Sequence, residues 1–289
     1  MSKIMFTKDI SSEGILRLYK EYNYKLEGKI LAKIHSGEEG NQNYLHPSLF
    51  KDLINYLDVT LGECNTAYEG SRHNNEVHLN LLKRHGWLDY KFDLLDKEGP
   101  DYCIDIPNGL KIKKNYVGKD ILNYDSLLVF THFKGHPMGG FGGSLKQLSI
   151  GFASSFGKKY IHGAGVTTGN TWATKQEDFI ASMADAAYSV DKLFKNKVVY
   201  INVLKNMSVD CDCCAIAEDP CLKDIGVLIS TDPLAIDKCS LDLIKASNDK
   251  GLEHFLERVN SKKGELILKY GEELGIGSLD YELIDIDNK

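Results

Sequence analysis

The sequence lacks an apolar run long enough to cross a membrane. Its most apolar stretches, such as SLLVF at residues 126–130, have the length of a β-strand, whereas a transmembrane helix needs about 20 apolar residues. The N-terminal segment MSKIMFTKDISSEG also lacks the apolar core of a signal peptide. We therefore expect a soluble cytoplasmic protein that has no membrane partner.

A surplus of positive charge is missing as well. The chain has 35 Lys and Arg against 41 Asp and Glu, a net charge of −6, which is opposite to the balance of a general nucleic-acid binder. Proline is scarce, with 6 in 289 residues, and 43% of the residues are hydrophobic. This composition excludes a disordered or fibrous chain. We expect a folded protein with no nucleic-acid partner, built as about two domains or one large α/β unit.

Cysteine is the residue type that stands out. Because a disulfide framework is not expected in a reducing cytoplasm, clustering among the seven cysteines indicates metal binding or catalysis. The segment SVDCDCCAIAEDPC contains four of them: Cys211, Cys213, Cys214 and Cys221. Their spacing matches neither zinc ribbons nor bacterial ferredoxins, but thiolates are the ligands of zinc and of iron–sulfur clusters. The acidic neighbours in this loop argue against the alternative, free thiols packed as small hydrophobic groups. We expect an iron–sulfur cluster of the 4Fe–4S type, with zinc as the alternative.

Strand-like and helix-like segments alternate along the chain. This alternation predicts an α/β fold of mostly parallel sheets covered by helices, with two lobes around a cleft. We place the lobes at residues 1–125 and 126–289, a boundary across which they could interleave. Asp232 and Pro233 mark one helix start, as N-cap and first-turn residue. The predicted strands are 3–8, 29–35, 59–64, 126–133, 197–204 and 224–231, and the predicted helices are 12–26, 46–57, 76–86, 144–156, 174–194 and 232–247.

A glycine-rich loop follows the apolar strand predicted at 126–133. Its glycines allow the backbone to approach a ligand, and Ser144 could cap a helix whose N-terminal N–H groups suit an anion. Histidine can act as acid, base or ligand near neutral pH, and lysine can do so when buried. The alternative is a tight turn with surface histidines. We predict substrate binding by Gly139, Gly140, Gly142, Gly143 and Ser144, and catalytic roles for His132, His136, Lys146 and, on weaker grounds, His162.

A second polar loop, CNTAYEGSRHNN at 64–75, also follows a predicted strand. Arg72 could bind a carboxylate or phosphate through two parallel hydrogen bonds. Asn65 and Glu69 lie in the same loop, and solvated surface side chains are the alternative for all three. We predict that this loop contributes to binding a small anionic substrate.

The sequence resembles the domain of unknown function 362 family, often described as uncharacterised iron–sulfur centre proteins. The resemblance rests on NTAYEGSR at 65–72, the glycine-rich block at 131–158, VDCDC at 209–213 and DIGVLISTDPLAIDKCSLDLI at 224–244. It implies that Cys211 and Cys213 are ligands of a cluster, with Cys214, Cys221 and Cys239 as further possible ligands. Many members carry a ferredoxin-like insert that is missing here, since residues 159–174 contain no cysteine. The resemblance therefore implies electron delivery by an external ferredoxin.

A fainter resemblance links HFKGHPMGGFGGSLK to the lactate racemase superfamily, in which a lysine tethers a nickel–pincer cofactor. It implies that Lys146, His132, His136 and His162 are cleft residues. The leading hypothesis is an iron–sulfur oxidoreductase that acts on a small anionic substrate. The alternatives are a non-redox isomerase or lyase that uses His, Lys and a metal, or a structural zinc- or cluster-binding protein.

Overall fold

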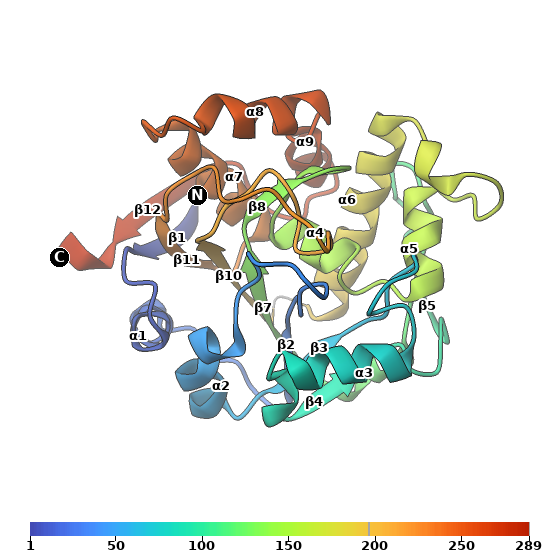
Figure 1. The fold of residues 1–289 in the computed structure, drawn as a ribbon, viewed down its shortest axis with the longest axis horizontal. Coiled ribbons are helices and arrows are strands. Elements are labelled where there is room, and N and C mark those ends of the chain that lie inside the picture. The colour runs from blue at the N-terminus through green and yellow to red at the C-terminus, as the bar shows by residue number, and fades with distance from the viewer. Residues whose placement is uncertain (196, 289) are drawn as a thin grey trace.

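An eight-stranded sheet with strand order β12-β1-β11-β10-β7-β2-β3-β4 forms the centre of the computed structural model, which describes residues 1–195 and 197–288 (Figure 1). β11 runs antiparallel to β1 and β10, and the other neighbouring pairs are parallel. The predicted α/β fold with a mostly parallel sheet is therefore confirmed. The strands are β1 (Ser2–Thr7), β2 (Ile30–Lys33), β3 (Thr60–Glu63), β4 (Phe92–Leu94), β7 (Ser126–His132), β10 (Val198–Leu204), β11 (Gly226–Ser230) and β12 (Tyr281–Asp285).

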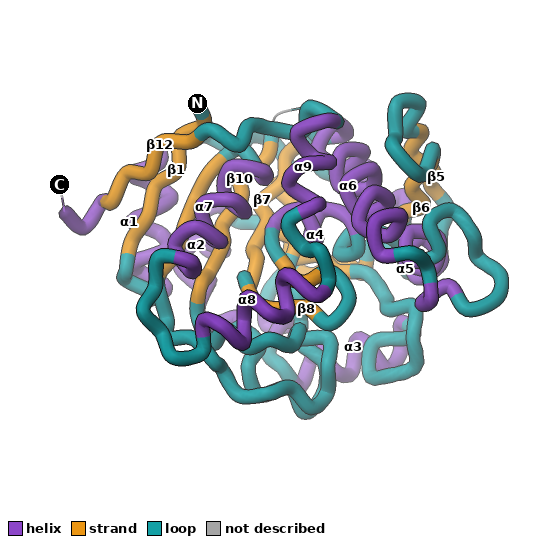
Figure 2. The backbone as a smooth tube through the Cα atoms, turned by 90° about the horizontal axis from the view of Figure 1, so that it is seen from above, coloured by secondary structure: helices purple, strands orange, loops and turns teal. Residues whose placement is uncertain are grey.

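Helices cover both faces of this sheet (Figure 2). Alternate residues of β7 point to opposite faces, so Leu127 and Val129 pack into one apolar cluster while Leu128 and Phe130 pack into the other. All seven residues of β7 are buried, as expected for a continuous apolar run in a parallel sheet. One face is covered by α4 (Ser144–Ser149), α6 (Gln176–Leu193), α7 (Pro233–Lys245) and α9 (Leu266–Glu273), and the other by α1 (Ser12–Tyr22) and α2 (Lys51–Leu57).

Local sequence signals place the helices well. The apolar residues that recur at helical spacing along α6, namely Phe179, Met183, Ala187 and Val190, are all buried, as is Phe194 at its C-cap. The N-cap of α7 is also confirmed, because the Asp232 carboxylate accepts hydrogen bonds from the N–H groups of Leu234 and Ala235. No helix of the described residues is long and apolar enough to span a membrane.

Two predicted elements differ from the structure. The predicted helix 144–156 is divided into α4 and α5 (Ser155–His162), because Ser154 caps a new helix by accepting the N–H of Gly157. The strand at 224–231 is expected within a mostly parallel sheet, but β11 is antiparallel because residues 205–225, which contain the cysteine loop and no crossover helix, return the chain beside β10. The other elements are α3 (Asn75–Arg84), α8 (Leu252–Ser261), the hairpin of β8 (Lys134–His136) and β9 (Gly140–Gly142), the pair β5 (Tyr102–Asp105) and β6 (Lys114–Val117), and the 3-10 helices Pro47–Phe50, Trp87–Asp89, Lys119–Asn123, Thr171–Ala173 and Ile286–Asn288.

The sheet joins strands from both predicted lobes, since β7 pairs with β2 on one side and β10 on the other. The division at residue 125 stays a prediction.

The carboxyl ends of four neighbouring parallel strands, β3, β2, β7 and β10, meet at one edge of the sheet. Ligands of α/β proteins bind at this kind of edge. The loops that leave it contain His35, Cys64, Arg72, His136 and the cysteine segment, so they bring residues far apart in the sequence into one region.

Candidate metal and substrate site

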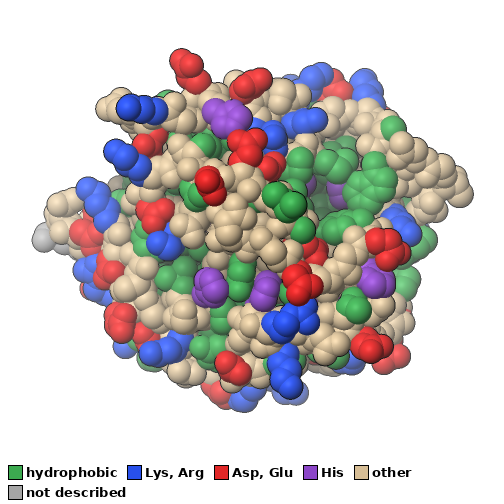
Figure 3. Space-filling view, viewed as in Figure 1, with side chains coloured by type: hydrophobic (Ala, Val, Ile, Leu, Met, Phe, Trp, Pro, Cys, Tyr) green, Lys and Arg blue, Asp and Glu red, His purple; other side chains and the backbone are tan. Residues whose placement is uncertain are grey.

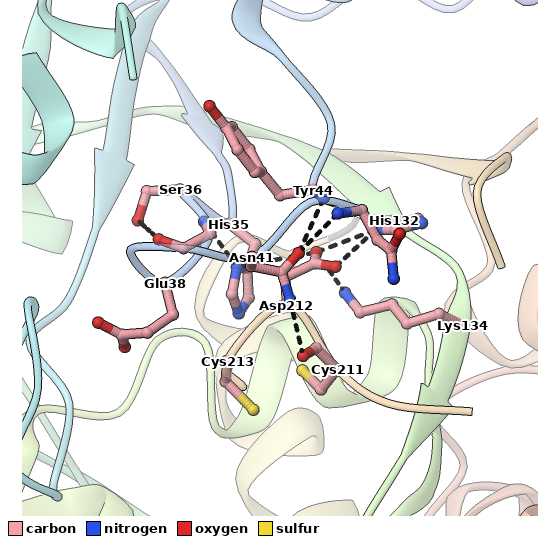
Figure 4. A network of polar contacts seen from close by, with 12 residues as sticks. His35, Ser36, Glu38, Asn41, Tyr44, His132, Lys134, Cys211, Asp212 and Cys213 are labelled. Carbon is pink, nitrogen blue, oxygen red and sulfur yellow. Dashed lines mark hydrogen bonds and ion pairs between the residues drawn. The ribbon is translucent and has the colours of Figure 1, made fainter. Parts of the chain in front are cut away.

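The cysteine loop is anchored by the buried carboxylate of Asp212 (Figure 4). His132 Nδ1 lies 2.8 Å from its Oδ1, Lys134 Nζ lies 3.0 Å from its Oδ2, and His35 Nδ1 lies 3.9 Å from the same oxygen. Burial alone would raise the pKa of Asp212, but the charges of His132 and Lys134 hold it well below its usual value. The loop is thus fixed to β2, β7 and β8 by an ionised side chain.

The contact with Asp212 also explains how the side chain of His132 is placed. Its second ring nitrogen, Nε2, lies 2.6 Å from the carbonyl oxygen of Lys205, so both nitrogens have partners in the protein. His132 positions Asp212, and it is not among the residues that line the neighbouring pocket. Its predicted catalytic role stays a prediction.

A cysteine–histidine group lies beside this anchor. One ring nitrogen of His136 and the Sγ atoms of Cys211 and Cys213 all lie within 4.8 Å of one another. Burial would raise the pKa of Cys211, but a hydrogen bond from the Cys213 thiol and the charges of Lys146 and Lys134 lower it well below its ordinary value. The pKa of Cys213 is raised in turn by its hydrogen bonds with Cys211 and Cys214. These shifts favour the thiolate on Cys211 over a thiolate on Cys213.

The tautomer of His136 follows from its backbone contacts. Nδ1 accepts hydrogen bonds from the N–H groups of Met138, at 3.1 Å, and Gly139, at 2.8 Å. Burial and the charge of Lys146 lower the pKa of His136 to about 4, so the neutral ring carries its proton on Nε2. Nε2 lies 4.0 Å from Cys213 Sγ. A histidine that binds a metal usually donates its other N–H to an acceptor, and here Nδ1 is itself the acceptor.

The donor set suits a thiophilic ion. Thiolates favour zinc and related metals, and donor atoms this close match a single ion with metal–sulfur bonds of about 2.3 Å. The tautomer indicates that the two sulfurs are the ligands and that His136 is a hydrogen-bond donor beside them. Cys214 hydrogen-bonds with Cys213. Two predicted ligands lie elsewhere: Cys221 Sγ is 3.5 Å from the carbonyl oxygen of Met207, and Cys239 is buried in α7 near Tyr281.

A pocket of about 290 Å³ adjoins the cysteine–histidine group. A hollow rimmed by hydrophobic side chains, with histidine at its floor, is visible near α6 in Figure 3. Five predicted site residues line the pocket together: Arg72, His136, Lys146, His162 and Cys213. The other lining residues are His35, Glu63, Cys64, Thr66, Ala67, Tyr68, Pro137, Met138, Gln147, Ile150, Gly151, Lys158 and Trp172.

Arg72 is part of a buried ionic network. Its Nε lies 3.1 Å from Glu38 Oε2, its Nη1 lies 3.4 Å from Glu63 Oε1, and its Nη2 donates to the Tyr68 hydroxyl at 2.9 Å. Two carboxylates thus balance the guanidinium charge, and its role in substrate binding stays a prediction. Of the other residues predicted in this loop, Glu69 is exposed, and Asn65 donates from its side-chain amide to Asn75.

The N-terminal N–H groups of α4, which follow the glycine-rich loop, bind a carboxylate of the protein itself. The Asp237 carboxylate accepts the N–H groups of Ser144, at 2.7 Å, and Leu145, at 2.9 Å, so it occupies the N-terminal end of α4. Burial raises the pKa of Asp237 to about 6. The prediction that Ser144 caps this helix is wrong, because Gly143 is the N-cap and the Ser144 hydroxyl donates to Asn202. A Cβ at Gly143 would lie 2.4 Å from Asp237 Oδ1, so a larger residue at this position would clash with the carboxylate.

None of the four glycines or Ser144 lines the described pocket, which contacts Pro137 and Met138 of the same loop. Substrate binding by the glycines and Ser144 stays a prediction. The sequence analysis missed Asp212, His35, Tyr68 and Lys158. His35 lies just after β2, as His132 lies at the end of β7. Its position after a predicted strand could therefore have identified it from the sequence. Lys158 lies one turn before His162, a spacing that becomes visible once α5 is known.

The fold and the site define an α/β protein with a cysteine–histidine group beside a pocket at the carboxyl edge of its sheet. The family Domain of unknown function (DUF362) matches residues 30–242, and the chain belongs to this family. No curated protein matches the chain.

Several solved chains are similar to it, including the following two. The lactate racemase apoprotein from Thermoanaerobacterium thermosaccharolyticum is 14% identical, with a TM-score of 0.49, over 82% of this chain and 56% of that chain. A protein from Thermotoga maritima is 11% identical, with a TM-score of 0.44, over 91% of this chain and 58% of that chain. The chain therefore spans less than two thirds of the length of either protein.

Proposed function

We propose that the pocket is the active site of a metal-dependent enzyme that transfers protons on a small anionic substrate. One observation carries the proposal: the side chains of Cys213, His136, Lys146 and His162 line the same pocket. Perturbed titratable groups that converge on a concave, partly apolar site are typical of catalytic centres.

The metal would be one thiophilic divalent ion held by Cys211 and Cys213. A bound ion of this kind supplies Lewis-acid polarisation of a substrate oxygen. Lys134 and Lys146 support the thiolate form that binds metal, since both lower the pKa of Cys211 against the effect of its burial. Cys213 reaches the pocket wall, so these sulfurs lie next to the space that a substrate would fill.

Two neutral histidines supply the proton chemistry. Burial lowers the pKa of His162 well below its ordinary value, and its ring is stacked 4.6 Å from Phe179 and packed 4.3 Å from Trp172. A neutral His162 can accept a proton from a substrate carbon and return it at another position, while Nε2–H of His136 can donate a hydrogen bond to the substrate. One proton is removed and one is returned, so the reaction is an isomerisation without electron transfer. Lys146 would stabilise the negative charge that develops between these two steps.

An iron–sulfur oxidoreductase is the second candidate. Cys214 favours it, because its thiol is hydrogen-bonded to Cys213 and makes three neighbouring sulfurs in one loop. A four-cysteine cluster needs a fourth ligand, and the thiols of Cys221 and Cys239 contact other groups.

Metal and sulfide analysis of protein purified without oxygen tests the proposal. We expect about one divalent ion per chain and no acid-labile sulfide in the wild type. C213S should lose the ion, whereas the control C221S, which changes the loop cysteine that contacts Met207, should keep it. Iron with equimolar sulfide would support the second candidate, and a wild type without metal would contradict both.

A further inference from the structure

Lys158 is a buried cation on the pocket wall. Its side chain belongs to α5, and the residue is only 7% exposed. Its ammonium donates to the carbonyl oxygen of Ala153 at 2.5 Å, and no carboxylate of the described residues lies within ion-pair distance of it. An ammonium has three donors, and burial without a charged partner is costly, so this arrangement favours an anion from outside the chain.

The nearest carboxylates are already engaged. Glu63 and Asp96 both influence Lys158 electrostatically. Glu63 accepts from Arg72 through Oε1, and from the Ser36 N–H and His78 through Oε2. Asp96 accepts the N–H groups of Asn65 and Ser155 through its two oxygens.

The other cations near the pocket differ from Lys158 in their partners or their exposure. Arg72 is paired with Glu38 and Glu63, and Lys134 is paired with Asp212. Lys33 contacts the carbonyl oxygen of Ile34 but does not line the pocket, whereas Lys146 lines it but is only partly buried. Among the described residues, Lys158 is the buried cation of the pocket wall that has no carboxylate within ion-pair distance.

A second observation points to a ligand at the same place. His162 follows Lys158 by one helical turn, so the two side chains lie about 5–6 Å apart at their Cβ atoms on one face of α5. His162 is 6% exposed, lines the pocket, and its Nδ1 atom has no hydrogen-bond partner among the described residues. A buried polar atom without a partner calls for a ligand or an ordered water.

We propose that Lys158 binds the carboxylate of a small monocarboxylate substrate and so places the adjacent carbon beside His162. This rests on the proposed function, and it names the substrate class and the residue that anchors it. One unmatched cation selects one negative charge. The pocket has a volume of about 290 Å³, and apolar side chains such as Met138 and Ile150 line part of it, which suits a short carbon chain.

Ligand-observed NMR with propionate, and with its uncharged analogue propionamide, tests this assignment. We expect the wild type to bind propionate and not propionamide. K158M should weaken propionate binding at least tenfold, whereas K159M, which removes the exposed neighbouring lysine, should bind as the wild type does. K158R should retain binding, because it keeps the charge.

Equal binding of propionate and propionamide by the wild type would overturn the proposal, and this comparison needs no variant. Unchanged propionate binding in K158M would overturn it as well, as would tighter binding of inorganic phosphate than of propionate. The same titration on C213S separates the two proposals. If the metal assignment is wrong, metal is missing from the wild type while propionate still binds.

Discussion

Two buried cations line the pocket, and they differ in their partners. Arg72 contacts Glu38, Glu63 and Tyr68, so its charge is neutralised within the protein. Lys158 contacts a backbone carbonyl, and no carboxylate of the described residues lies within ion-pair distance of it. A buried charge with a full set of partners stabilises a loop, whereas a buried charge without one is available to a ligand.

Breaking the Arg72 network should give the largest effect. R72M leaves Glu38 and Glu63 buried without their cation, and we expect it to lower the free energy of unfolding by about 3–5 kcal/mol. K158M breaks no ion pair, so we expect it to change that free energy by no more than about 1 kcal/mol. Urea denaturation of both variants measures the difference.

R84M is the control, because Arg84 and Glu39 form an ion pair in which both side chains are at least half exposed. It should cost less than about 1 kcal/mol. Equal losses of unfolding free energy in R72M and K158M would show that Arg72 and Lys158 do not differ in their partners as described.

The pH dependence of stability should give a somewhat smaller effect, through Lys33. Burial lowers the pKa of Lys33 from 10.5 to about 8, against the opposing charge of Glu63. Between these values the unfolded chain binds more protons than the folded one, so stability rises with pH. Burying the charged Lys33 therefore lowers the unfolding free energy by its full amount below pH 8, and this loss disappears as the pH passes 10.5.

We therefore expect the unfolding free energy of the wild type, relative to K33M, to rise by about 3 kcal/mol between pH 7 and pH 10.5. The measurement is urea denaturation at both pH values. K29M, which changes an exposed lysine, should show no such trend relative to the wild type. A difference between wild type and K33M that is independent of pH would mean that Lys33 is not desolvated.

Much of the fold could be predicted from the sequence, because the signals are local. The apolar runs of β7 and β10 and the Asp232 cap of α7 each depend on a few consecutive residues. The direction of β11 could not be predicted, since the same buried pattern suits either orientation beside β10. The break between α4 and α5 depends on the Ser154 cap inside a segment that is otherwise helical in character.

The candidate site also contains some residues whose roles could be predicted from the sequence and others whose roles could not. Residues at strand ends were predicted, and His136, Lys146 and Cys213 do meet at the pocket. The roles of Asp212 and Asp237 could not be predicted, because each depends on a partner about 80 or 90 residues away. Their carboxylate partners, and not their burial, distinguish Arg72 from Lys158, and no sequence pattern records which buried cation has a carboxylate beside it.

The central claim is that Cys211 and Cys213 hold a single ion beside the pocket. X-ray absorption at the edge of the bound metal counts its sulfur neighbours directly. The account predicts two sulfur atoms at about 2.3 Å, with lighter atoms completing the shell. A shell of four sulfurs with neighbouring iron atoms, or a metal without sulfur ligands, would contradict it.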